Sequence, residues 1–150
     1  MTAPRRIRLS RARGWRLPDN AVNVARPGRW GNPFVVGQDG TRLQCAAKFA
    51  LLAGGFIAFS DQPDPDAQLA LWRRIRRDVT SLAGKDLACW CALDGGGCHG
   101  DVLLHLANPG SLPPEWMRGP IELPRIRLGL AATDFEKLRR KARTKGAAGS

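Results

Sequence analysis

Apolar residues recur at helical spacing in two segments of this chain. The first begins after Thr41, where apolar residues three and four apart predict a helix with Thr41 as its N-cap and residues 54–55, both glycine, as its end. The second runs through residues 72–82 and predicts a helix capped by Asp66, with four arginines mainly on its polar face. Those arginines either face solvent or bind phosphate, and the pattern leaves both open.

Shorter apolar runs predict strands over residues 21–25, 34–36 and 86–91. The last run is followed by a glycine-rich loop at 94–97 and by a short apolar helix at 102–107. Strands that alternate with helices are typical of a parallel sheet. The pattern therefore predicts a small single α/β domain with a short, mainly parallel sheet flanked by helices, similar to a Rossmann fold.

Composition divides the 150 residues into four parts. We expect a basic N-terminal arm at 1–16, the α/β core at 17–108, a proline-rich strap at 109–132 and a basic helix or tail at 133–150. A capping-box pattern at Thr133 marks the start of that last helix.

The formal net charge of +11 is concentrated at the two ends of the chain. Residues 1–16 and 118–150 each sum to +6, whereas the residues between them sum to −1. Basic ends beside a neutral body favour contact with a polyanion, so nucleic acid or a nucleotide is the expected partner. Charged tails that serve only solubility are the alternative.

The cysteines and the longest apolar stretch bear on the compartment. Four cysteines without the regular spacing of a secreted scaffold predict free thiols or metal ligands in a reducing compartment, so we expect a cytoplasmic protein. Residues 43–59 are the longest apolar stretch, but Lys48 and two glycines interrupt it. We therefore expect no membrane span.

The densest chemistry lies where the last predicted strand ends. Cys91 follows that strand, and Cys98 and His99 begin the next helix, whose N-terminal dipole stabilises a thiolate. This predicts a catalytic site in which Cys91 or Cys98 reacts with a lowered pKa and His99 transfers protons. Asp101 would orient His99 or hold a ribose hydroxyl. The loop before Cys98 would cradle a phosphate on the backbone N–H groups of Gly95, Gly96 and Gly97.

The same segment offers a metal site, which is the alternative to thiol chemistry. Its ligands would be Cys89, Cys91, Cys98 and His99, the composition of a Cys₃His zinc site. Cys89 and Cys91 would lie about 6.5 Å apart along a regular strand, which disfavours convergence on one ion. The sequence thus leaves the cofactor open, with zinc as the candidate. The alternative role of Cys89 is that of a small apolar residue in the core.

A second loop, at residues 26–33, follows the first predicted strand. In a parallel sheet it would lie at the same edge as the Cys-His loop, and the two would form one cleft. Trp30 would stack on a base and Asn32 would hydrogen-bond the edge of that base, while Arg26 or Arg29 would bind phosphate. The alternative interpretation is that Trp30 packs in the core and that Asn32 is an ordinary turn residue.

The motifs that carry a family resemblance are Arg26-Pro27, Trp30-Gly31-Asn32-Pro33-Phe34, Gly84-Lys85-Asp86-Leu87-Ala88-Cys89-Trp90-Cys91 and Cys98-His99-Gly100-Asp101. Through them the chain resembles, over about residues 5–108, a family of small bacterial and phage proteins called domain of unknown function 4326. The resemblance implies that both loops belong to one domain. It implies no particular activity.

Three functions follow from these observations. The leading hypothesis is an enzyme or sensor of nucleotides or nucleic acid, acting by transfer or hydrolysis at a base, sugar or phosphate. The alternative is a non-catalytic nucleic-acid-binding protein whose Cys/His cluster is structural, with or without zinc. In a third, the basic ends of a phage protein dock onto an acidic surface of a host protein.

Overall fold

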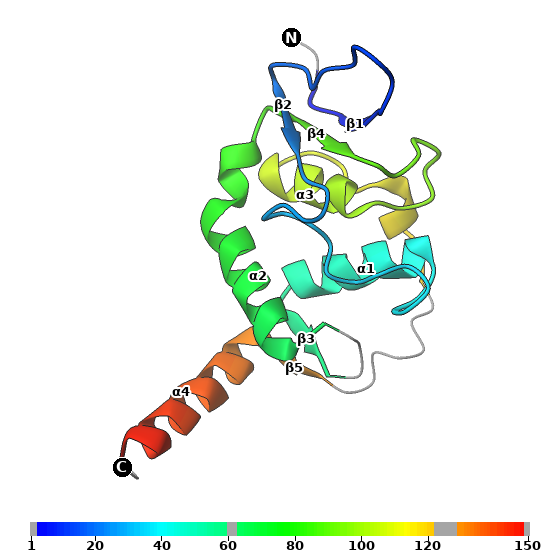
Figure 1. The fold of residues 1–150 in the computed structure, drawn as a ribbon. Coiled ribbons are helices and arrows are strands. Elements are labelled where there is room, and N and C mark those ends of the chain that lie inside the picture. The colour runs from blue at the N-terminus through cyan, green and yellow to red at the C-terminus, as the bar shows by residue number, and fades with distance from the viewer. Residues whose placement is uncertain (1–2, 60–62, 122–128, 149–150) are drawn as a thin grey trace.

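The computed structural model describes residues 3–59, 63–121 and 129–148 of the chain. Within these ranges the strands are β1 (Arg6–Arg8), β2 (Ala21–Asn23), β3 (Phe56–Ala58), β4 (Asp86–Cys89) and β5 (Gly129–Ala131). The α-helices are α1 (Arg42–Ala53), α2 (Pro65–Asp78), α3 (His99–Ala107) and α4 (Ala132–Ala148). The strands form two small sheets, and α1, α2 and α3 pack between and beside them (Figure 1).

Three parallel strands form the larger sheet, in the order β1, β4, β2. The central strand is β4, in which Leu87 pairs with Arg6 of β1 and with Val22 of β2. Leu87 and Ala88 are fully buried, because a central parallel strand is covered on both faces. The prediction of a small α/β domain with a parallel sheet is confirmed. The strand, loop and helix expected over 86–107 occur in that order, but β4 ends at Cys89 and α3 begins at His99.

The edge strand β1 comes from the basic N-terminal segment, which the charge pattern predicts to be an arm. Ile7 pairs with Ala88, and the Leu9 N–H donates to the Cys89 carbonyl over 2.9 Å. Leu9 is itself buried. The expectation of an arm is therefore wrong for residues 6–9, because two apolar side chains between the arginines pack once a partner strand is available.

The second sheet is antiparallel and consists of β3 and β5, with Phe56 paired to Ala131. β5 leads directly into α4, whose first residue, Ala132, donates its N–H to the Gly55 carbonyl over 2.8 Å. The predicted cap at Thr133 is wrong, since the helix begins one residue earlier on the end of a paired strand. From there α4 extends away from the body of the molecule (Figure 1).

The ends of α1 and α2 show how local signals set helix boundaries. α1 begins and ends as predicted, with Thr41 in a capping box and Gly54 after its last residue. α2 is capped by Asp64 and not by the predicted Asp66. The Asp64 carboxylate accepts the Asp66 N–H over 2.8 Å, and Pro65 occupies the first helical position.

A turn replaces the strand predicted at residues 34–36. Phe34 is buried in the core, whereas Val36 is exposed and makes an isolated bridge. The Val35 N–H donates to the Asp39 carboxylate over 2.8 Å. Because a side chain satisfies this backbone group, no neighbouring strand is needed and the strand prediction is wrong.

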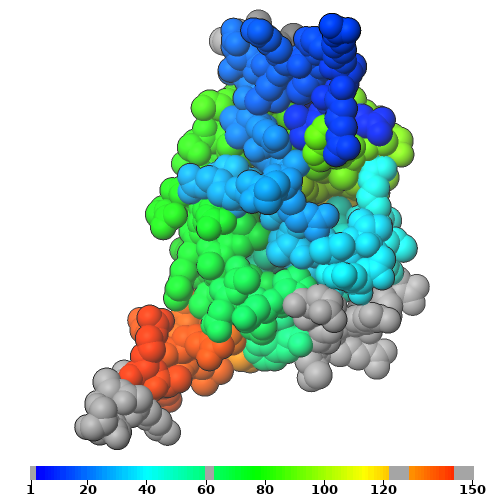
Figure 2. Space-filling view, in the orientation of Figure 1, coloured from blue at the N-terminus to red at the C-terminus, as the bar shows by residue number. Residues whose placement is uncertain are grey.

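The core lies between the parallel sheet and the helices. Its fully buried side chains include Val24 after β2, Phe49 and Leu52 of α1, Leu87 of β4 and Leu103 of α3. α2 runs along one side of the body from the parallel sheet toward β3 (Figure 1). The space-filling view places the N-terminal segment at one end of the molecule and α4 at the other (Figure 2).

Part of the proline-rich strap is described, and residues 122–128 lie outside the described ranges. Glu115–Met117 form a short 3₁₀ turn, from which Trp116 and Met117 pack against the core. Among the helices of the described ranges, none combines the length and the apolar character that a membrane span requires.

Candidate functional site

A cavity of about 220 Å³ lies at the carboxyl ends of β2 and β4. Three segments make its wall. The segment after β2 contributes Ala25, Arg26, Asn32, Phe34 and Val36; α1 contributes Arg42, Cys45 and Ala46; and the segment from the end of β4 to the start of α3 contributes Cys89, Trp90, Cys91, Gly97, Cys98 and His99. The two loops therefore line one cavity, as expected for loops that follow parallel strands.

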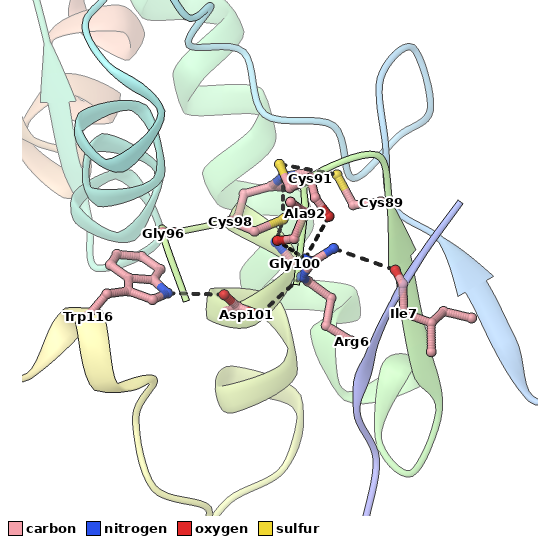
Figure 3. Close-up of polar contacts among 12 residues, drawn as sticks. Arg6, Ile7, Cys89, Cys91, Ala92, Gly96, Cys98, Gly100, Asp101 and Trp116 are labelled. Carbon is pink, nitrogen blue, oxygen red and sulfur yellow. Dashed lines mark hydrogen bonds and ion pairs between the residues drawn. The ribbon is translucent and has the colours of Figure 1, made fainter. Parts of the chain in front are cut away.

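Three cysteines and one histidine gather at this cavity. The sulfurs of Cys89 and Cys98 and a ring nitrogen of His99 all lie within 4.8 Å of one another. The Cys91 sulfur is 3.9 Å from the Cys89 sulfur (Figure 3), and the Cys98 sulfur is 3.9 Å from Nδ1 of His99. Cys89, Cys98 and His99 are buried, and Cys91 is half-buried. We call these four residues the Cys-His cluster.

The backbone explains how Cys89 and Cys91 come together. The strand prediction extends to Cys91, which would separate the two sulfurs along a regular strand. In the structure β4 ends at Cys89, so the chain turns before Cys91 and the sulfurs approach to 3.9 Å. The argument against convergence of these two cysteines is therefore wrong.

His99 is fixed by its backbone partner. Its Nε2 lies 2.7 Å from the Val24 carbonyl, which only accepts hydrogen bonds, so Nε2 carries the proton. Nδ1 then faces the Cys98 sulfur with its lone pair. Burial lowers the pKa of His99 below its ordinary value, which favours the neutral ring.

Hydrogen bonds among the cysteines shift the pKa values of two thiols in opposite directions. The bonds with Cys91 and Cys98 lower the pKa of Cys89 to about 2. The bond with Cys89 in turn raises the pKa of Cys98 above its ordinary value. The expectation of a lowered pKa at the N-terminus of α3 is therefore wrong for Cys98, because its thiol lies beside a sulfur that carries the charge.

Asp101 does not act on His99. Its carboxylate pairs with Nε of Arg6 over 3.3 Å and accepts the indole N–H of Trp116 over 3.0 Å (Figure 3). Arg6 also donates to the carbonyls of Cys91 and Ala92, over 2.7 and 2.8 Å. Asp101 is thus part of a structural network beside the cavity, and its predicted catalytic role is not supported.

Two residues predicted to bind a ligand lie away from the cavity. Trp30 is 4% exposed, so it closes the core instead of offering a face to a base. Arg29 pairs with Asp78 at the end of α2, and its guanidinium covers the Trp30 ring at 5.2 Å. The core alternative for Trp30 is therefore the correct one.

Arg26 and Asn32 do lie on the cavity wall. The Asn32 amide donates to the Cys45 carbonyl over 3.1 Å and accepts the Phe34 N–H over 3.0 Å, so these contacts hold the loop in shape. Arg26 is exposed, and no carboxylate in the described part of the chain forms an ion pair with it.

The sequence pattern missed Arg42, which shapes the glycine-rich loop. From the first turn of α1 it pairs with Asp94 at 2.8 Å and donates to the carbonyls of Ala92 and Gly97, over 2.7 and 2.8 Å. Gly97 consequently lines the cavity, whereas residues 95–96 do not. No local signal could reveal these contacts, because they join residues 50 or more positions apart.

Trp90 is the second cavity residue that was missed. It is 43% exposed, and the guanidinium of Arg11 lies 4.8 Å from the centre of its ring. Arg8 donates to its carbonyl over 3.3 Å. The alternation of the Cys-Trp-Cys sequence gave no sign of this position, because in a strand it places the middle residue on the opposite face from its neighbours.

All residues of the cavity wall lie within residues 7–109, over which the chain matches the family model described as Domain of unknown function (DUF4326). The chain belongs to the DUF4326 family. The resemblance drawn from the two loop motifs is thereby confirmed, and the DUF4326 match also takes in most of β1. No curated protein and no solved structure matches the chain.

Proposed function

We propose that this protein binds a nucleotide or a single-stranded nucleic acid at the mouth of the cavity. The observation that carries the proposal is the position of Arg26, an exposed side chain on the cavity wall without an ion-pair partner in the described part of the chain. A guanidinium in such a place is suited to phosphate, which it binds through two parallel N–H···O bonds.

Trp90 supports a ligand that carries a base as well as a phosphate. An exposed indole at a cavity is suited to base stacking, which tolerates any base because every base has a π face. The Arg11 guanidinium lies 4.8 Å from the centre of this ring, so a planar group already has room over the indole. In the proposed complex a base stacks on Trp90, and Arg11 contributes to binding the backbone.

The basic N-terminal segment supports the same location. β1 runs beside β4, and Arg8 and Arg11 lie against Trp90. The proposed contact surface therefore includes the cavity mouth and this segment. A chemical step on the ligand is not included, because the carboxylate of Asp101 is bound to Arg6 and Trp116.

Fluorescence anisotropy with a labelled single-stranded oligonucleotide tests the proposal in the full-length protein. We expect Arg26→Ala to weaken binding by roughly tenfold or more, since it removes a charged hydrogen-bonding group worth about 1.5–3 kcal/mol. Trp90→Ala should also weaken binding, since it removes a stacking platform worth about 1–3 kcal/mol per base. The affinity of the unmodified protein for the oligonucleotide should fall as the salt concentration rises.

The matched control is Arg77→Ala, which removes an exposed arginine on α2 that pairs with the neighbouring Asp78. It should leave the affinity unchanged. Equal losses in Arg26→Ala and Arg77→Ala would mean that net charge alone attracts the oligonucleotide, and the cavity site would be rejected. Competition by an acidic protein but not by nucleotides would favour the docking function instead.

A further inference from the structure

We propose that Cys89, Cys91, Cys98 and His99 bind one zinc ion between the end of β4 and the start of α3. The proposal does not depend on nucleic-acid binding. It rests on the arrangement of the four ligand atoms, on the anchoring of the histidine and on the groups that surround the sulfurs.

Three of the ligand atoms, from Cys89, Cys98 and His99, lie near the spacing around one tetrahedral ion, and the Cys91 sulfur adjoins them through its contact with Cys89. With Zn–S bonds of about 2.3 Å, two sulfurs of a tetrahedral site lie roughly 3.8 Å apart. The Cys89 and Cys91 sulfurs are 3.9 Å apart, and the Cys98 sulfur is 3.9 Å from Nδ1 of His99. The atoms of Cys89, Cys98 and His99 lie within 4.8 Å of one another, so a small contraction brings them onto one centre.

The histidine is held as a metal ligand is usually held. Nε2 of His99 donates to the Val24 carbonyl, which fixes the tautomer and leaves the Nδ1 lone pair facing the sulfurs. A ligating histidine commonly donates its other N–H to a carbonyl or a carboxylate in this way. The ring is also packed against Phe49, with centroids 5.2 Å apart, so it cannot turn freely.

The surroundings suit a cluster of thiolates. The Gly100 N–H donates to the Cys98 sulfur over 3.4 Å, at the N-terminal end of α3, where a negative charge is stabilised. Zinc with three thiolates and a neutral imidazole has a net charge of −1. Arg6 and Arg42 place two positive charges beside the cluster, since they donate to the carbonyls of Cys91 and Gly97, respectively.

The donor set favours zinc over magnesium and calcium. Thiolate and imidazole ligands in a tetrahedral arrangement favour zinc, whereas magnesium and calcium need oxygen ligands. A disulfide is not formed, because its sulfurs would have to lie about 2.05 Å apart. The Cys89 and Cys91 sulfurs are nearly twice that distance from each other.

Metal analysis of the full-length protein, purified reduced and without chelator, tests the site. We expect about one zinc per chain by native mass spectrometry and by elemental analysis. Replacement by cobalt should give the sulfur-to-metal charge-transfer absorption and the intense visible bands of a tetrahedral thiolate site. This measurement uses the unmodified chain, so it does not depend on whether variants fold.

Cys98→Ser and Cys45→Ser form a matched pair, since both cysteines line the cavity and each is 2% exposed. We expect Cys98→Ser to lower zinc affinity by at least about tenfold and Cys45→Ser to leave it unchanged. Arg26→Ala should keep its zinc even where it loses oligonucleotide binding, which separates this proposal from the proposed function.

Three results would overturn the zinc site. One is a protein whose four thiols all titrate as reduced but which takes up neither zinc nor cobalt. Another is a cobalt spectrum of an octahedral oxygen site. The third is zinc that stays in Cys98→Ser and leaves in Cys45→Ser.

Discussion

Arg6 joins the parallel sheet to the Cys-His cluster. Its side chain is 6% exposed, and its guanidinium contacts the carboxylate of Asp101 and the carbonyls of Cys91 and Ala92. In the sequence it is one of six arginines in a short basic segment, where a solvated charge is the natural interpretation. Its burial depends on residues 85 or more positions away, so no local pattern distinguishes it from its neighbours.

At this scale we predict that Arg6→Ala lowers the free energy of unfolding by about 3 kcal/mol, because Asp101 and two carbonyls lose their shared donor. Arg5→Ala is the control, since Arg5 is exposed and its contact with Asp86 is made by the backbone N–H. That change should stay within roughly 0.5 kcal/mol of the unmodified protein. Urea unfolding followed by tryptophan fluorescence measures both, and equal losses would show that Arg6 acts only through net charge.

At the scale of elements, local sequence signals identified the helices and strands whose ends and apolar runs depend on neighbouring residues. Thr41 and the glycines after α1 marked the ends of that helix, and the apolar run over 86–91 contains β4. β1 and β5 were not predicted, because each lies in a segment that composition assigns to a basic arm or a proline-rich strap and forms by pairing with a distant strand. Such pairing leaves little trace in composition or spacing.

For the candidate site, the position of the two loops was predicted from the sequence, whereas the orientation of their side chains was not. The rule that loops after parallel strands meet at one edge placed both loops at one cavity. Which side chains face that cavity depends on where each strand ends and on what the core buries. The Trp30 side chain is buried in the core and does not face the cavity. Because β4 ends at Cys89, the chain turns and brings the Cys91 sulfur close to the Cys89 sulfur.

The pairing of β3 with β5 gives a prediction for an element that the sequence did not reveal. A Cβ at Gly129 would lie 2.3 Å from the Ile57 carbonyl oxygen and 2.5 Å from the Phe56 ring. We expect Gly129→Ala to separate the strands and to cost about 1–3 kcal/mol, as overpacking does. Thermal unfolding of Gly119→Ala, where a Cβ meets nothing within 4 Å, is the control. A Gly129→Ala protein as stable as this control would contradict the tight strand approach.

At the scale of the molecule, the two basic ends of the chain are far apart. The N-terminal segment lies beside β4 and the cavity, whereas α4 extends from the opposite end of the body (Figures 1 and 2). The described basic residues of the N-terminal segment and those of α4 therefore lie on two separate surfaces. Within the described residues the N-terminal segment adjoins the proposed ligand site and α4 does not, so removal of α4 should alter oligonucleotide affinity less than loss of Arg26 or Trp90.

Phe135 is the largest buried side chain among the described residues of α4. Phe135 is 6% exposed and packs 5.8 Å from the Phe59 ring, while Leu138 on the same helix is 53% exposed. We predict that Phe135→Ala costs about 3 kcal/mol and detaches α4, since the ion pairs of Arg73 and Arg139 are exposed and contribute little. Hydrogen exchange should then accelerate in α4 while β4 stays protected, because most of the core that covers β4, including Leu87 and Leu103, comes from elements other than α4. Leu138→Ala should leave both unchanged. Acceleration in α4 and β4 together would instead show that the helix and the DUF4326 domain unfold as one cooperative unit.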